Sequence, residues 1–83
     1  MLEIHYSEAA ELFLRKLKNK ADKKLIFDKI RKYAETQTGN VVPVKGTPYY
    51  RLRAGNYRII FDRYGNIIEI LEIGGRGYIY RGY

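Results

Sequence analysis

The segment that decides the fold is residues 49–61, YYRLRAGNYRIIF, which is followed by residues 67–73, IIEILEI. Apolar and polar side chains alternate through much of both segments, which is typical of strands that cover a core with one face. The pairs Gly55-Asn56 and Gly65-Asn66 favour turns between these strands. The predicted strands span residues 49–54, 57–63 and 66–73, with a short fourth strand near 78–81. The second half of the chain therefore predicts a small antiparallel sheet.

The first half of the chain predicts an edge strand over residues 2–6 and two helices. Ser7 is a suitable N-cap for a helix that ends near Asn19, and a second helix is predicted from about Asp22 to the segment 36–40. The apolar positions recur at helical spacing: Ala9, Leu12, Phe13 and Leu17, with Ala10 and Leu14 alongside, and then Leu25, Ile26, Ile30, Tyr33 and Ala34.

Few residues separate the two helices, which favours an antiparallel helical hairpin. Residues 41–44 are three valines around Pro43, and residues 45–48, KGTP, form a predicted loop that leads into the sheet. The predicted fold class is α+β, with the N-terminal strand and the helical hairpin packed on one face of the antiparallel sheet. We expect a single domain over residues 1–83, with the other face of the sheet open for binding.

The composition narrows the functional class. The hydrophobic fraction of 46% is ordinary for a globular chain, and the absence of cysteine removes disulfides and thiolate chemistry. No apolar run approaches the roughly 20 residues that a membrane span needs, and the first residues do not have the pattern of a signal peptide. We therefore expect a cytoplasmic protein with no membrane partner.

The net charge of +7 is distributed unevenly along the chain. Residues 1–40 hold seven Lys and two Arg, whereas residues 41–83 hold six Arg and only one Lys. The helical lysines have the ordinary role of a solvated face. Arginine in strands points to more than solubility, because its planar guanidinium grips phosphate with two hydrogen bonds and stacks on rings. Nucleic acid is the favoured partner, and an acidic protein partner remains open.

Strand alternation predicts which arginines share a face. Arg51 and Arg53 point the same way, roughly 6–7 Å apart along their strand. Arg58 is predicted to join them on the open side, while Tyr57, Ile59 and Phe61 cover the helices. The interleaved tyrosines favour a surface that binds phosphates and stacks bases.

Most catalytic patterns are absent from the sequence. The only histidine, His5, is far in sequence from the arginines and is not expected to be catalytic, and the scattered acids match no metal-binding motif. We expect no metal and no cofactor. RNA carries its own nucleophile, the 2′-hydroxyl, so its cleavage needs in-line geometry, charge stabilisation and proton transfer. Arginines can supply the charge stabilisation, and Tyr80 or Lys45 is a candidate for the proton transfer.

Two segments resemble a known family. Residues 50–61, YRLRAGNYRIIF, are similar to the pattern YRLRxGxYRxxY of RelE-like toxins, and residues 73–81, IGGRGYIYR, are similar to their VGHRxxVYR ending. The chain therefore resembles the RelE/ParE superfamily of type II toxin–antitoxin toxins, and more closely its RelE branch. The resemblance covers nearly the whole chain and implies a ribosome-dependent mRNA endonuclease.

The resemblance also implies roles for individual residues. Arg58 and Arg76 match arginines that stabilise the transition-state phosphate, and Tyr80 matches a tyrosine that stacks on and positions the substrate or transfers a proton. The expected RNA-binding residues are Lys45, Arg51, Arg53 and Arg81. Gly75 departs from the pattern, because many relatives carry His or Lys there.

The resemblance implies several partners: a cognate antitoxin in a hetero-oligomer, the ribosome and mRNA. Two alternatives remain open. A ParE-like inhibitor of DNA gyrase needs no nuclease residues, and a non-cleaving relative would keep the basic face as an RNA-binding surface.

Overall fold

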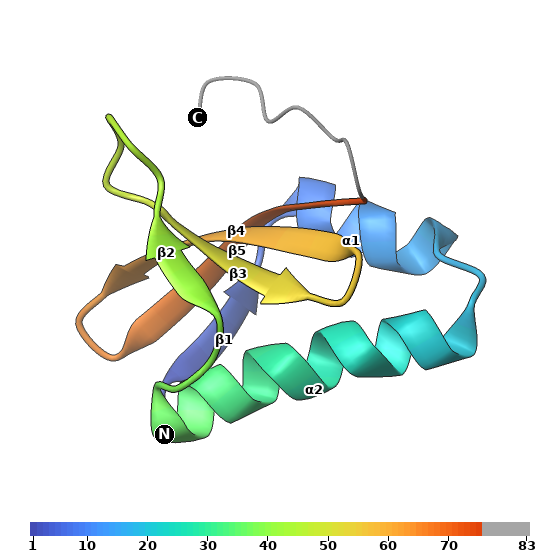
Figure 1. Cartoon of the computed structure of the whole chain (residues 1–83), viewed down its shortest axis with the longest axis horizontal. Coiled ribbons are helices and arrows are strands. Elements are labelled where there is room, and N and C mark those ends of the chain that lie inside the picture. The colour runs from blue at the N-terminus through green and yellow to red at the C-terminus, as the bar shows by residue number, and fades with distance from the viewer. Residues whose placement is uncertain (76–83) are drawn as a thin grey trace.

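The computed structural model describes residues 1–75 and has an α+β fold, in which two helices cover one face of a five-stranded sheet (Figure 1). The predicted fold class is thus confirmed. The strand order is β1-β5-β4-β3-β2. The elements along the chain are β1 (Glu3–Tyr6), α1 (Glu8–Lys16), α2 (Lys20–Thr36), β2 (Val41–Pro43), β3 (Tyr50–Ala54), β4 (Tyr57–Tyr64) and β5 (Ile67–Gly74).

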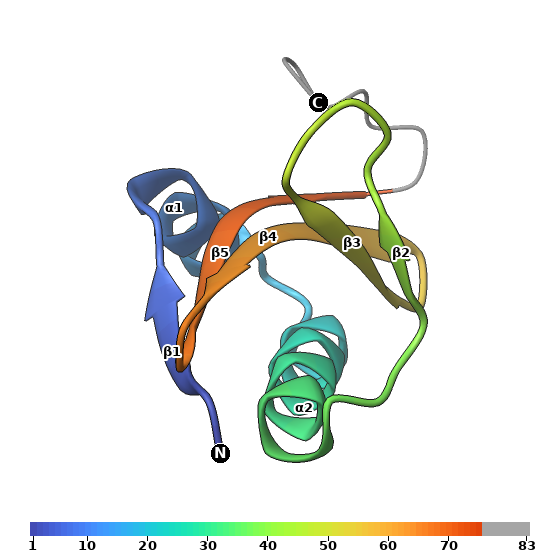
Figure 2. The same ribbon diagram turned by 90° about the vertical axis from the view of Figure 1, so that its left-hand side faces the viewer.

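The sheet is mixed, because β1 runs parallel to β5 while the other neighbouring strands are antiparallel. The two helices carry the chain from β1 across one face to β2 at the opposite edge, and β3, β4 and β5 then return toward β1 (Figure 2). Strand β2 was not among the predicted strands. It contains Pro43, and an edge strand tolerates a residue without an N–H.

Both helices begin at a polar cap. The Ser7 hydroxyl accepts a hydrogen bond from the Ala10 N–H at 3.1 Å, and the Asn19 side chain accepts one from the Asp22 N–H at 3.0 Å. Asn19 caps the start of α2 and does not belong to α1. As a result α1 ends earlier than predicted, at Lys16, and α2 begins earlier than Asp22, at Lys20.

The core lies between the helices and the sheet. Phe61 of β4 is fully buried and contacts Tyr33 of α2, with ring centroids 5.0 Å apart. On α1 the buried residues are Ala10 and Leu14, whereas Leu12 remains 44% exposed. The buried stripe of α1 is therefore turned away from the predicted Ala9 and Leu12. The remaining buried core side chains include Ile26, Ile30, Leu52, Ile59, Ile68, Ile70 and Ile73.

A β-bulge on β5 lets its uneven hydrophobic pattern face one side. Ile60 pairs with Glu72 and Phe61 pairs with Ile70, so Leu71 is the extra residue. Strict alternation would place Ile70 and Ile73 on opposite faces, and the bulge brings both to the core. The Ser7 hydroxyl donates to the Leu71 carbonyl at 2.6 Å and satisfies a backbone group at this irregularity.

Two tight turns join β3 to β4 and β4 to β5, as predicted. Gly55 and Gly65 each have a positive φ, 61° and 55°, as the first central residue of a two-residue hairpin turn requires. A Cβ on Gly55 would lie 2.8 Å from the Leu25 side chain, so α2 also restricts this turn. Within residues 1–75, neither helix has the length and apolar run needed to cross a membrane.

Candidate nucleic-acid interface

Three arginines share the face of the sheet that points away from the helices, and we call them the arginine cluster: Arg51, Arg53 and Arg58. Arg53 pairs directly opposite Arg58, and Arg51 lies two residues before Arg53 on β3. Leu52 and Ala54, which alternate with these arginines, are buried on the helix side. The sequence prediction that the three arginines share a face is therefore confirmed.

The positive charges of the arginine cluster lie close together on two neighbouring strands. Like charges directly opposite each other on neighbouring strands are unfavourable, and Arg53 and Arg58 stand in that relation. No carboxylate of residues 1–75 forms an ion pair with any member of the cluster. The Arg53 Nε donates to the Gly55 carbonyl at 3.2 Å, which orients the guanidinium with its terminal nitrogens available. Such a surface suits an anion with several oxygens.

Lys45 lies on the loop of residues 44–49, which joins β2 to β3. Figures 1 and 2 show this loop rising from the sheet on the side away from α2, the side that carries the arginine cluster. Thr47 fixes the loop: its hydroxyl donates to the Val44 carbonyl at 2.9 Å and accepts from the Tyr49 N–H at 3.1 Å. The exposed Lys45 is therefore part of a hydrogen-bonded loop, and its predicted role in RNA binding stays a prediction.

The sequence had suggested that the face away from the helices is open, but one apolar position on it is buried. Ile60 lies on this face between Arg51 and Glu72, yet it is fully buried and separate from the helix-side core cluster. Burial raises the pKa of the Glu72 carboxyl. The arginine cluster therefore borders a covered apolar position, which lowers the local dielectric and strengthens charge interactions.

Acidic and polar groups occupy the other end of the same face. His5, Glu69 and Asp62 form one row across β1, β5 and β4, and the Tyr64 hydroxyl donates to Glu69 at 2.9 Å. This row is four residues from Arg58 along β4, about 13 Å. The His5 ring contacts Glu3 and has no place in the arginine cluster. No group of three or more potential metal ligands occurs among the described residues.

Three residues of the predicted site, Arg76, Tyr80 and Arg81, lie outside the described residues. Arg76 follows Gly74 by two positions in the sequence, and Gly74 pairs directly opposite Arg58. Gly75 is described, and a Cβ built on it has no atom within 4 Å. A Cβ at position 75 would therefore make no close contact with the described residues.

Sequence reasoning missed a tether beneath the arginine cluster. The Tyr57 hydroxyl donates to the Asp22 carboxylate at 2.7 Å, and its ring meets Phe13 edge to face, with centroids 6.0 Å apart. The hydrogen bond to Asp22, together with burial, raises the pKa of Tyr57. This contact fixes β4 next to Arg58 to the start of α2. The only sequence signal was a tyrosine on the helix-facing side, because the two residues are 35 positions apart.

The sequence matches no protein-family model and no curated protein. The structure is similar to a chain of the intact E. coli RelBE toxin–antitoxin complex, with a TM-score of 0.75, 17% identity and coverage of 95% of this chain and 100% of that chain. A chain of the Staphylococcus aureus YoeB–YefM complex is similar with a TM-score of 0.76 and 22% identity, and the match covers 96% of this chain and 99% of that chain. A chain of the archaeal RelE–RelB complex from Pyrococcus horikoshii is similar with a TM-score of 0.72 and 24% identity, and the match covers 94% of this chain and 98% of that chain. This chain therefore has the fold of RelE-like toxins.

Proposed function

We propose that this chain is the toxin of a type II toxin–antitoxin pair and cleaves mRNA on the ribosome. The observation that carries the proposal is the arginine cluster, in which Arg53 and Arg58 face each other without a carboxylate partner among the described residues. Its presence on a RelE-like fold supports the same reaction class. The partners are mRNA, the ribosome and a cognate antitoxin that keeps the toxin inactive in the cytoplasm.

The proposed reaction uses the RNA 2′-hydroxyl as its nucleophile. The 2′-oxygen attacks the adjacent phosphorus while the bond from phosphorus to the 5′-oxygen breaks, which leaves a 2′,3′-cyclic phosphate and a 5′-hydroxyl. One proton leaves the 2′-oxygen and one is delivered to the 5′-oxygen. Arg58 and Arg76 stabilise the charge that develops on the phosphate, and Tyr80 positions the substrate or transfers a proton.

The remaining basic residues hold the RNA. Arg51 and Arg53, about 6–7 Å apart along β3, match the spacing of successive phosphates on an extended strand. Lys45 and Arg81 extend the same binding surface. The site has no histidine in the arginine cluster and a glycine at position 75, so the ribosome must supply much of the substrate orientation.

Mapping of mRNA 5′ ends after brief expression tests the proposal. We expect new ends within translated reading frames, growth arrest, and little cleavage of naked RNA. Plasmid supercoiling is measured in the same cultures. A loss of supercoiling without new mRNA ends would replace the proposal with inhibition of DNA gyrase, and neither effect, with RNA binding retained, would indicate a non-cleaving relative.

A further inference from the structure

One carboxylate of the sheet lies beside the arginine cluster. Glu72 of β5 pairs directly opposite Ile60 of β4, and Gly74, two residues further along β5, pairs opposite Arg58. Residues two apart on a strand share a face, so Glu72 lies on the same face as Arg58, diagonally across the two strands. Diagonal neighbours of this kind are about 7–8 Å apart, which is within reach of long side chains. Glu72 and Arg58 can therefore contact one bound nucleotide together.

The other carboxylates on this face of the sheet are further from Arg58. Asp62 and Glu69 pair with each other in a row four residues away along β4, about 13 Å. Glu3 lies on the edge strand β1 and contacts the ring of His5. Among the carboxylates that residues 1–75 contribute to this face, Glu72 is the one that the strand register places next to the arginine cluster.

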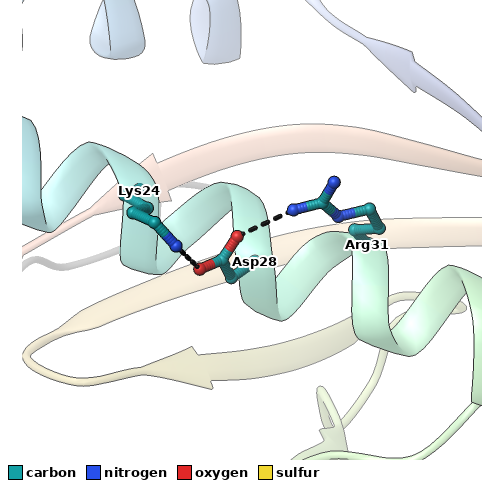
Figure 3. A network of polar contacts seen from close by, with 3 residues as sticks. All are labelled: Lys24, Asp28 and Arg31. Carbon is teal, nitrogen blue, oxygen red and sulfur yellow. Dashed lines mark hydrogen bonds and ion pairs between the residues drawn. The ribbon is translucent and has the colours of Figure 1, made fainter.

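The surroundings of Glu72 differ from those of a carboxylate in an ion pair. On the exposed surface of α2, Asp28 accepts from Lys24 at 2.7 Å and from Arg31 at 2.9 Å (Figure 3). The hydrogen bond from Lys24 is the main cause that holds the pKa of Asp28 below its usual range. Glu72 is instead half-buried beside the fully buried Ile60, and burial raises the pKa of its carboxyl. A carboxylate with a raised pKa is the stronger base of the two.

The elements around Glu72 carry charges of both signs. Arg58 of β4 is its diagonal neighbour, and Arg51 of β3 lies beyond Ile60 in the same row across the sheet. The helix α1 also packs against β5, and its charged residues are Glu8, Glu11, Arg15 and Lys16. Positive neighbours favour the ionised carboxylate, whereas burial favours the neutral acid. These opposing effects suit a group that accepts a proton and then releases it.

We propose that Glu72 is the general base that accepts the proton of the RNA 2′-hydroxyl. Because the proposed function supplies the RNA substrate, this assignment rests on that function. The Glu72 carboxylate takes the proton while the 2′-oxygen forms its bond to phosphorus and the bond from phosphorus to the 5′-oxygen breaks. The 5′-oxygen receives a proton from water or from Tyr80, and Glu72 then returns its own proton to water. Glu72 therefore accounts for one of the two proton transfers, and the 5′-oxygen side still has glycine at position 75.

Removal of the charge at position 72 distinguishes a base from a carboxylate that only balances nearby positive charge. In the second case Glu72→Gln would strengthen RNA binding and would not slow cleavage. For a base, we expect Glu72→Gln to slow single-turnover cleavage of ribosome-bound mRNA at least 100-fold, with binding as strong as in wild type or stronger. Glu69→Gln is the matched control on the same strand and face, and it should cleave within threefold of wild type. Melting temperatures check both folds.

The pH profile of the same reaction gives a second readout. The wild-type rate should rise about tenfold per pH unit at low pH and then level off, because the protonated carboxyl cannot accept a proton. The inflection is expected above the ordinary glutamate value of about 4.3, since burial raises the pKa of Glu72. Glu72→Asp should keep such an inflection at a reduced rate, and Glu72→Gln should lose it. An inflection that persists unchanged in Glu72→Gln would contradict the assignment.

A modified mRNA separates the two proton transfers. Sulfur in place of the 5′-oxygen at the mapped cleavage position leaves without a proton, because a thiol has a pKa of only about 8.5. We expect Glu72→Gln to remain at least 100-fold slower than wild type on this mRNA. Recovery of the wild-type rate would make Glu72 the acid at the 5′-oxygen and overturn the inference.

The wild-type reaction keeps the two proposals apart. Equal cleavage of ordinary mRNA by wild type and Glu72→Gln overturns the role of Glu72 and leaves the proposed function standing. Absence of cleavage by wild type overturns the proposed function and the role of Glu72 with it.

Discussion

The same strands supply both faces of the sheet, because successive residues along a strand point to opposite faces. On β4, Ile59 and Phe61 are fully buried against the helices, while Arg58, between Tyr57 and Ile59, projects to the other side. The helix face holds the fold together, and the opposite face gathers charge that folding does not need. Stability and recognition are therefore assigned to alternate residues, and substitutions on the two faces should have separable effects.

The largest expected effect is on the helix face. Phe61→Ala removes a fully buried ring that packs on Tyr33 and Tyr50, and should lower the free energy of unfolding by about 3–5 kcal/mol. Urea denaturation measures this change. The matched variant on the other face, Arg51→Ala, should change stability by no more than about 0.5 kcal/mol. Similar losses for the two variants would break the division between the faces.

The next effect is on the arginine cluster and its sequence neighbour. In the proposed site Arg58 and Arg76 each donate to the reacting phosphate, so Arg58→Ala and Arg76→Ala should each reduce toxicity in step with a rate loss of about 10²–10³. Growth after induction measures toxicity, and circular dichroism checks the fold. Arg63→Ala is the control, because Arg63 contacts Gln37 at 3.4 Å on the helix side and should be nearly as toxic as wild type.

Position 75 tests whether the site lacks a proton-transfer group. Gly75→His should raise the cleavage rate about tenfold and add a pH dependence between pH 5 and 8, because histidine titrates there. Among the described residues, no atom lies within 4 Å of a Cβ built on Gly75. Gly75→Ala is the control for backbone stiffening and should leave the pH profile unchanged. Equal rates and profiles for the two variants would show that position 75 takes no part in proton transfer.

The smallest effect concerns the tether between the sheet and α2. Tyr57→Phe removes the hydrogen bond to Asp22 and should lower the free energy of unfolding by about 0.5–1.5 kcal/mol. The pKa of Tyr57 is raised in the folded chain, so its contribution is complete below the ordinary value near 10 and is lost as pH rises through the raised pKa. Chemical denaturation at neutral and strongly alkaline pH compares the variants. A constant difference across this range would contradict the assigned bond.

Sequence reasoning succeeded where a single local rule decides the structure. Strand alternation placed Arg51, Arg53 and Arg58 on one face, and the Gly-Asn pairs located both hairpin turns. Helix periodicity found the buried residues of α2, including Ile26 and Ile30.

The remaining features depend on contacts between distant segments. The parallel pairing of β1 follows from the path of both helices across the sheet, and β2 forms only because β3 offers an edge. The bulge at Leu71 and the burial of Ile60 follow from packing across strands. The bond between Tyr57 and Asp22 joins two elements that no local pattern connects. Local alternation thus predicted the arginine cluster but not the hydrogen bond between Tyr57 and Asp22 that holds β4 to α2.

Single-turnover cleavage of mRNA bound to purified ribosomes tests whether the arginine face carries out catalysis. Wild type, Arg58→Ala and Arg63→Ala are compared at saturating enzyme, so that the measured rate reports the chemical step. We expect cleavage by wild type and by Arg63→Ala at similar rates, and a rate about 10²–10³ lower for a folded Arg58→Ala. Equal cleavage by Arg58→Ala and wild type would contradict the assignment of catalysis to the arginine face.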